Sequence, residues 1–142
     1  MDSMDLPTAT KADVSLRVPA DSAYVSVLRT MTAGLAARLD FTVDDIEDLR
    51  ISVGEACALV LPEALPGGDL EAEFRLTPGT LTVSVSVPTD GSRIADQDSF
   101  AWQVLSTLTG TASASGEGSR FEVTFTTESS IPVPGAPPGA GG

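Results

Sequence analysis

The side chains that carry most enzyme chemistry are scarce in this sequence, which has no histidine and one cysteine, Cys57. The absence of histidine excludes His-based catalytic triads and the usual transition-metal sites. One cysteine closes no internal disulfide and builds no multi-cysteine zinc site. Cys57 falls on the apolar side of a predicted helix, with no basic residue beside it in sequence. We therefore expect a buried structural thiol rather than a reactive one.

Arg29 is the polar residue whose type and position most favour a binding role. It follows Leu28 in a predicted helix, beside the apolar stripe of that helix. A guanidinium can form two parallel hydrogen bonds with a carboxylate, and arginine is enriched at the energetic centres of protein interfaces. Most surface arginines are solvated, so a partner-binding Arg29 and a solvated Arg29 both stay open.

The charge balance disfavours nucleic acid as a partner. The chain of 142 residues has 20 acidic and 8 basic residues and a formal net charge of −12, whereas binding to phosphates needs lysine and arginine to displace counterions. A basic protein partner is compatible with this charge. The acidic residues between Asp44 and Asp48 fit a solvated helix N-terminus, and they could also attract a basic partner surface.

Two amphipathic helices are predicted in the first half of the chain. Asp21 or Ser22 caps the first, and Thr42 with Asp45 resembles a capping box at the start of the second, which runs over residues 43–61. Apolar residues at spacings of three and four define the two stripes that we expect to be buried. These are Tyr24, Val27, Leu28, Met31, Leu35 and Leu39 on the first helix, and Ile46, Leu49, Val53, Cys57 and Val60 on the second.

Strands are predicted where apolar and polar residues alternate, at residues 14–18, 70–76, 81–87 and 121–125. A short helix within residues 100–108 precedes the last strand, and Gly116 and Gly118 fit a hairpin-type turn. The element order β-α-α-β-β-α-β predicts an α/β (α+β) fold of two layers. In it, one mixed, mostly antiparallel sheet is covered on one face by about three helices.

The two ends of the chain are expected to lie outside this domain. Residues 1–12 are predicted to be a flexible leader, residues 13–127 the domain, and residues 128–142 a disordered tail rich in proline and glycine. No apolar run reaches the ~18 residues of a membrane span. Residues 1–11 have no apolar stretch of the signal-peptide type, so we expect a cytoplasmic protein.

The segment LAARLDFTVDDIEDLRISVGEAC, at residues 35–57, resembles the RsbW-like anti-sigma factors. These are serine-protein kinases with the fold of the GHKL (histidine-kinase-like) ATPases. The resemblance covers residues 13–127 and is strongest from Tyr24 to Leu61. The later segment DSFAWQVLSTLTG looks most like the actinobacterial members.

The resemblance implies a protein that sequesters a stress-type or sporulation-type sigma factor. Release would follow partner switching with an anti-anti-sigma protein, and the protein would be a homodimer. Arg29 matches an arginine that binds both partners in the family, and Tyr24 is expected to flank the same surface. The alternative that the resemblance also implies is an ATP-dependent serine kinase acting on the anti-anti-sigma protein. A third alternative is a structural remnant of the family, a protein that keeps the fold but whose partner is not a sigma factor.

The motifs that would carry kinase chemistry depart from the family pattern. In the family, a glutamate acts as base and an asparagine four residues later holds Mg²⁺; Glu55 matches the glutamate, but Leu59 stands at the asparagine position. A leucine has no oxygen for a hard cation. Glu55 is therefore either a surviving base or a solvated or capping glutamate kept by ancestry.

The two glycine-containing motifs are also altered. Thr89-Asp90-Gly91-Ser92-Arg93 stands where the family has Asp-x-Gly-x-Gly, so Asp90 is one position from the adenine-binding aspartate. Ser99-Phe100-Ala101-Trp102 stands where glycines would cradle phosphate. Phe100 and Trp102 are expected to be core aromatics, with an interface role left open. We expect no bound cofactor, and ATP with Mg²⁺ would be needed only under the kinase alternative.

Overall fold

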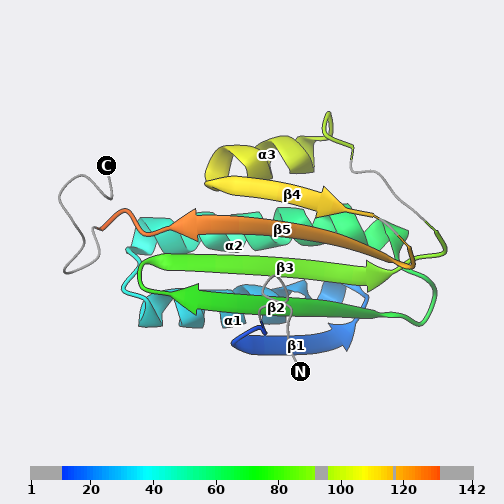
Figure 1. The fold of residues 1–142 in the computed structure, drawn as a ribbon, viewed down its shortest axis with the longest axis horizontal. Helices are drawn as coiled ribbons and strands as arrows, with labels where there is room; N and C mark the ends of the chain where they lie inside the picture. Colours follow the sequence, from blue (N-terminus) through cyan, green and yellow to red (C-terminus); the bar gives the residue numbers. More distant parts are fainter. Residues whose placement is uncertain (1–10, 92–95, 117, 132–142) are drawn as a thin grey trace, which may run out of the picture.

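Alternating side chains build five strands, which are β1 (Val14–Pro19), β2 (Asp69–Thr77), β3 (Thr80–Pro88), β4 (Thr111–Ser115) and β5 (Arg120–Glu128). A computed structural model describes residues 11–91, 96–116 and 118–131. The strands form one sheet in the order β1-β2-β3-β5-β4, and each neighbouring pair is antiparallel (Figure 1). The predicted fold class is confirmed, with one correction. The sheet is antiparallel within the described ranges, not mixed.

Three α-helices of the described chain cover one face of this sheet. They are α1 (Val25–Arg38), α2 (Val43–Val60) and α3 (Phe100–Leu108); the 3-10 turn η2 (Ser22–Tyr24) precedes α1, and η3 (Leu61–Glu63) follows α2. The long helix α2 lies in the middle, against β3 and β5, with α1 on one side and α3 on the other (Figure 1). No helix within residues 11–91, 96–116 and 118–131 has both the length and the apolar character that crossing a membrane requires.

The helix starts follow the predicted caps. The Thr42 hydroxyl accepts a hydrogen bond from the Asp45 amide at 3.1 Å, and the Asp45 carboxylate accepts one from the Thr42 amide at 3.3 Å. This reciprocal pair is the capping box, with aspartate in the place usually held by glutamate or glutamine. The carboxylate of Asp21 accepts from the Ala23 amide at 2.8 Å, so Asp21 caps η2, and α1 begins three residues later than that cap predicts.

The buried side of α1 differs from the predicted stripe. The residues that α1 buries are Val25, Leu28, Thr32 and Ala36. Tyr24 and Val27, which were expected to be buried, are 39% and 42% exposed. The small residues of α1 face the interior, and Thr32 keeps its hydrogen bond because its hydroxyl donates to the Leu28 carbonyl at 2.7 Å. Of the large residues of the predicted stripe, Tyr24 and Val27 are left exposed, whereas Met31, Leu35 and Leu39 are half-buried and pack against the core.

Alternation of large apolar residues does not predict β4, whose sequence is Thr-Ala-Ser-Ala-Ser. Its two alanines, Ala112 and Ala114, are half-buried against the core and pair with Phe125 and Val123 of β5. Pairing with β5 thus supplies the apolar partners that the β4 sequence lacks. Gly118, in the connection to β5, has a φ of 71°, a backbone conformation that glycine adopts readily.

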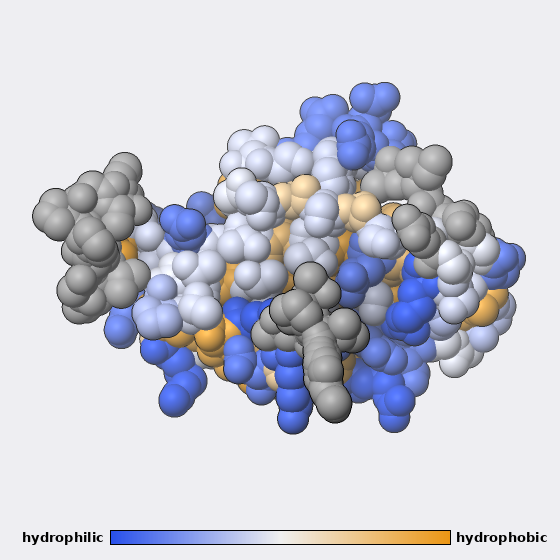
Figure 2. All heavy atoms as spheres, viewed as in Figure 1, coloured by the Kyte–Doolittle hydropathy of each residue, from blue (hydrophilic) through white to orange (hydrophobic). Residues whose placement is uncertain are grey.

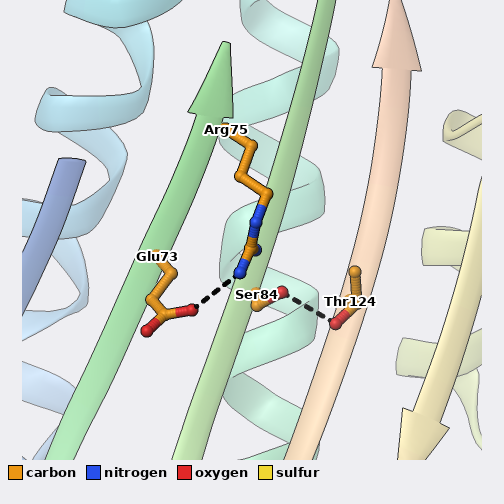
Figure 3. A network of polar contacts seen from close by, with 4 residues as sticks. All are labelled: Glu73, Arg75, Ser84 and Thr124. Atoms are coloured by element: carbon orange, nitrogen blue, oxygen red, sulfur yellow. Dashed lines mark hydrogen bonds and ion pairs between the residues drawn. The ribbon is translucent and has the colours of Figure 1, made fainter. Parts of the chain in front are cut away.

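The face of the sheet that the helices leave open carries hydroxyl and charged side chains. The hydroxyls of Ser84 and Thr124 bond at 2.8 Å across β3 and β5, and the Arg75 guanidinium donates to the Glu73 carboxylate at 3.3 Å on β2 (Figure 3). Figure 2 shows this face, on which weakly polar and strongly hydrophilic residues predominate. The candidate site residues of α1 and α2 lie on the other, helical side of the sheet.

Candidate functional site

The position that matches the family's magnesium-binding asparagine packs against the hydrophobic core. Leu59, near the end of α2, is half-buried and packs against the core residues. Its side chain offers no oxygen, whereas Mg²⁺ requires oxygen ligands. Glu55, one turn earlier, is half-buried and forms no hydrogen bond or ion pair with the described residues. The described ranges also contain no cluster of three or more metal-ligating His, Cys, Asp or Glu side chains.

The segment that matches the family's adenine-binding motif lies just after β3. Gly91 has a φ of 148°, and the Thr89 hydroxyl donates to the Gly91 carbonyl at 2.8 Å. The Thr89 amide donates to the Ser119 carbonyl at 2.7 Å, which ties this segment to the β4–β5 connection. Asp90 is exposed. Arg93, which replaces the second glycine of the family motif, lies outside the described residues.

The start of α3, where the phosphate-binding glycines would stand, is capped from within the chain. The Ser99 hydroxyl accepts a hydrogen bond from the Trp102 amide at 3.2 Å, which uses one of the amides that a phosphate would need. Trp102 is half-buried against the core, as expected for a core aromatic. Phe100 is 78% exposed, so the expectation of a core residue is wrong for it.

The exposed Phe100 ring lies beside a shallow apolar groove between α2 and α3. The groove has a volume of about 360 Å³ and is lined by Ile51, Phe100, Gln103, Val104, Thr107 and Leu108. Because α3 has only nine residues, its first residue and its last one line the same groove. The exposed aromatic at the start of α3 therefore belongs to an apolar surface rather than to a phosphate cradle.

Arg29 lies on the opposite side of α2. Its side chain is exposed, and its guanidinium rests against the backbone of α2 at Gly54. A Cβ atom added to Gly54 would lie 2.5 Å from Arg29 Nη2. No carboxylate of the described residues lies within ion-pair distance of this guanidinium, although the chain has 20 acidic residues. Arg29 is thus a charged group with donors left for an external acceptor.

The structure does not bring the predicted site residues into one cluster. Successive residues of an α-helix are turned by about 100°, so Gly54, beneath Arg29, and Glu55 leave α2 in different directions. Tyr24 is the last residue of η2, directly before α1, and is 39% exposed. The Arg29 side of α2 and the Glu55–Leu59 side are therefore two separate candidate sites.

A second surface of α1, not anticipated from the sequence, is an apolar groove of about 620 Å³. It is lined by Ser26, Val27, Thr30, Met31, Gly34, Leu35 and Arg38. The signal for it was the apolar stripe, whose members Val27, Met31 and Leu35 the pattern assigns to the core. Large apolar residues at helical spacing cannot tell a buried face from an exposed groove, which is why sequence reasoning missed it.

A contact between distant parts of the chain holds the start of α2. The Asp45 carboxylate accepts hydrogen bonds from the Ser130 amide at 3.0 Å and the Ser130 hydroxyl at 2.9 Å, in addition to its role in the capping box. Partial burial opposes ionisation, but these hydrogen bonds together with those from Thr42 hold the pKa of Asp45 below its usual value. Residues 85 positions apart form this contact, so no local pattern predicts it.

Cys57 is fully buried, as predicted, and burial raises the pKa of its thiol to about 12, while the charge of Arg29 opposes part of that shift. The unfolded thiol loses its proton near pH 9.0, so above that pH the unfolded state binds fewer protons than the folded state. Stability must then fall as pH rises, by up to ~1.4 kcal/mol per pH unit between about pH 9 and 12.

We expect urea unfolding at pH 8, 9.5 and 10.5 to show this loss in the native sequence. In Cys57→Ala the thiol contribution is absent, so the unfolding free energy should decline less steeply over the same pH range. Parallel declines in the two proteins would mean that the thiol titrates alike in the folded and unfolded chains, which contradicts its burial.

Comparison with curated proteins finds relatives that share the name serine-protein kinase RsbW. The chain is 39% identical over 88 residues to a serine-protein kinase RsbW of Halalkalibacterium halodurans, a match that covers 61% of this chain and 52% of the relative. It is 33% identical over 75 residues to the proteins of the same name from Bacillus thuringiensis and Bacillus anthracis, covering 51% of this chain and 47% of each relative. The chain thus spans about half the length of the curated relatives it matches. No protein-family model matches it. The resemblance to RsbW-like proteins is confirmed by these matches.

Proposed function

We propose that the chain is an anti-sigma factor, which binds and sequesters a sigma factor of the stress or sporulation type. The observation that carries the proposal is Arg29, an exposed residue whose guanidinium rests against α2 and pairs with no carboxylate of the described residues. Such an arginine can give charge-assisted hydrogen bonds to an acidic side chain of a partner. The similarity to proteins named RsbW supports a sigma factor as that partner.

Release of the sigma factor would follow partner switching. An anti-anti-sigma protein that binds an overlapping surface competes with the sigma factor, so the tighter complex at working concentrations decides which partner is held. Because sigma factors act on the transcription machinery, this function would place the chain in the cytoplasm. We propose a homodimer as the binding unit, on the strength of the resemblance.

The second candidate function is an ATP-dependent kinase that phosphorylates a serine of the anti-anti-sigma protein. The matched relatives are named serine-protein kinases, and Glu55 stands where the resemblance puts the base. Phosphoryl transfer, however, depends on metal ions and phosphate contacts that neutralise developing charge. Leu59 packs against the core, and Ser99 caps α3 from within the chain. We therefore favour binding without nucleotide.

The proposal is tested by recovering the 142-residue chain, with an affinity tag, from its native host and identifying what comes with it. We expect a sigma factor in near-equal amount, retained when EDTA removes Mg²⁺, because none of the proposed contacts uses a metal ion. Recovery of a different protein in place of a sigma factor would support the remnant alternative. Loss of the sigma factor in EDTA would shift the case toward a nucleotide-dependent complex.

A further inference from the structure

Gly54 occupies an unusual place for glycine, the interior of the long helix α2 (Val43–Val60). Glycine is the poorest helix former after proline, so a glycine at such a site lowers the stability of the helix relative to alanine. At Gly34, the other glycine in the described helices, no heavy atom beyond its chain neighbours and the nearby backbone of its own helix lies within 4 Å of the position where a Cβ would stand. At Gly54 the same position is filled by the side chain of Arg29.

The contact involves the whole guanidinium group of Arg29. A Cβ on Gly54 would lie 2.5 Å from Nη2 of Arg29, 3.2 Å from its Cζ and 3.2 Å from its Nε. Three atoms of one planar group near one point mean that the guanidinium lies over the Gly54 backbone. A methyl group would take that space, because real Cβ contacts essentially never come below 3.0 Å. The arginine head is the flexible member, so it would move while α2 stays in place.

The part of α2 that the Arg29 guanidinium contacts is electrically neutral. Gly54 brings no side chain, and Cys57, one turn further along α2, is a buried thiol that stays protonated at neutral pH because burial raises its pKa. No carboxylate of the described chain satisfies the guanidinium from elsewhere. The contact with Gly54 thus restricts where the arginine head can lie without consuming its positive charge.

We propose that Gly54 is a positioning residue for Arg29, which sets the direction in which the guanidinium is presented to a carboxylate of the partner protein. This inference rests on the proposed function, in which Arg29 contacts the partner. A long arginine side chain loses much rotamer freedom when it binds, and holding it beforehand reduces that loss. The size of residue 54 therefore determines how well the surface of α1 and α2 recognises an acidic side chain.

The test is a double-mutant cycle on the full chain, with the sigma factor that copurifies with it as the probe. Isothermal titration is expected to show about 10-fold weaker binding for Gly54→Ala and a larger loss for Arg29→Ala. The double variant should bind no more weakly than Arg29→Ala alone, because Gly54 acts through the arginine. Native affinity in Gly54→Ala beside a weakened Arg29→Ala would overturn the inference and leave the proposed function standing. Unchanged affinity in both would remove the proposed role of Arg29 as well.

A readout that needs no partner separates positioning from folding. In ¹H–¹⁵N spectra, Gly54→Ala should shift the Nε–Hε signal of Arg29, whereas Gly34→Ala, the matched control in α1, should leave it in place. Both variants should keep or raise Tm, since alanine favours helix more than glycine does. If Gly54→Ala instead lowers Tm, adding Arg29→Ala should restore it by removing the clash. An unmoved Arg29 signal in Gly54→Ala would overturn the inference.

Discussion

Replacing Arg29 with alanine is expected to weaken the proposed complex with a sigma factor at least about 30-fold, which corresponds to ~2 kcal/mol. Arg29 is exposed on α1, and its guanidinium has no carboxylate partner among the described residues, so its donors are available to a partner protein. Truncation removes these donors and leaves the carboxylate of the partner unpaired at the interface, which adds to the loss. Titration of the purified sigma factor into each protein measures the effect.

Two variants make this result specific to the arginine head. Arg17→Ala changes the net charge by the same amount, but Arg17 lies on β1, with 71% of its side chain exposed and an ion pair to Asp69 at 3.6 Å. It should bind the sigma factor as the native chain does. Arg29→Lys keeps the charge and loses the planar, two-donor geometry, so an intermediate loss is expected. Equal losses in Arg17→Ala and Arg29→Ala would show that only the overall charge matters.

The sequence predicted the fold where one local period dominates. Large apolar residues alternate with polar ones in β2, β3 and β5, and this period of two identifies a half-buried strand without any tertiary information. The start of α2 was also predictable, because the capping box of Thr42 and Asp45 is a local interaction. The resemblance in the same helix identified the relatives that the comparisons then found.

What the sequence did not predict depends on contacts between elements. The strand β4 contains only alanine as an apolar residue type, and its pairing with β5 makes it a strand. On α1, Thr32 and Ala36 are buried although they lie outside the predicted stripe, whereas Met31 and Leu35 of that stripe are only half-buried, because close packing inside favours residues that fit over residues that are most hydrophobic. The contact of Arg29 with Gly54 joins two helices, so helical spacing in either one carries no sign of it.

Titration of the folded chain with ATP and Mg²⁺ is expected to give no saturable heat up to about 1 mM nucleotide, a limit that corresponds to a binding free energy weaker than ~4.1 kcal/mol. Two parts of the family pattern meet an obstacle in this structure. Leu59 offers no oxygen to the metal, and the Ser99 hydroxyl already holds an amide at the start of α3. Saturable heat at micromolar nucleotide would contradict this and move the kinase alternative ahead, with phosphate transfer to a serine as the next assay.

Restoring a metal ligand at position 59 alone is expected to give no saturable heat in the same titration with ATP and Mg²⁺. Leu59→Asn places an amide oxygen near Glu55, but Ser99 and Phe100 still stand where the family has phosphate-binding glycines. Because Leu59 packs against the core, circular dichroism must first show that this variant is folded. A folded Leu59→Asn protein that binds ATP would mean that the residue at position 59 alone prevents ATP binding in the native chain. Absence of saturable heat would mean that the start of α3 also prevents nucleotide binding. The next variant would then combine Leu59→Asn with Ser99→Gly and Phe100→Gly.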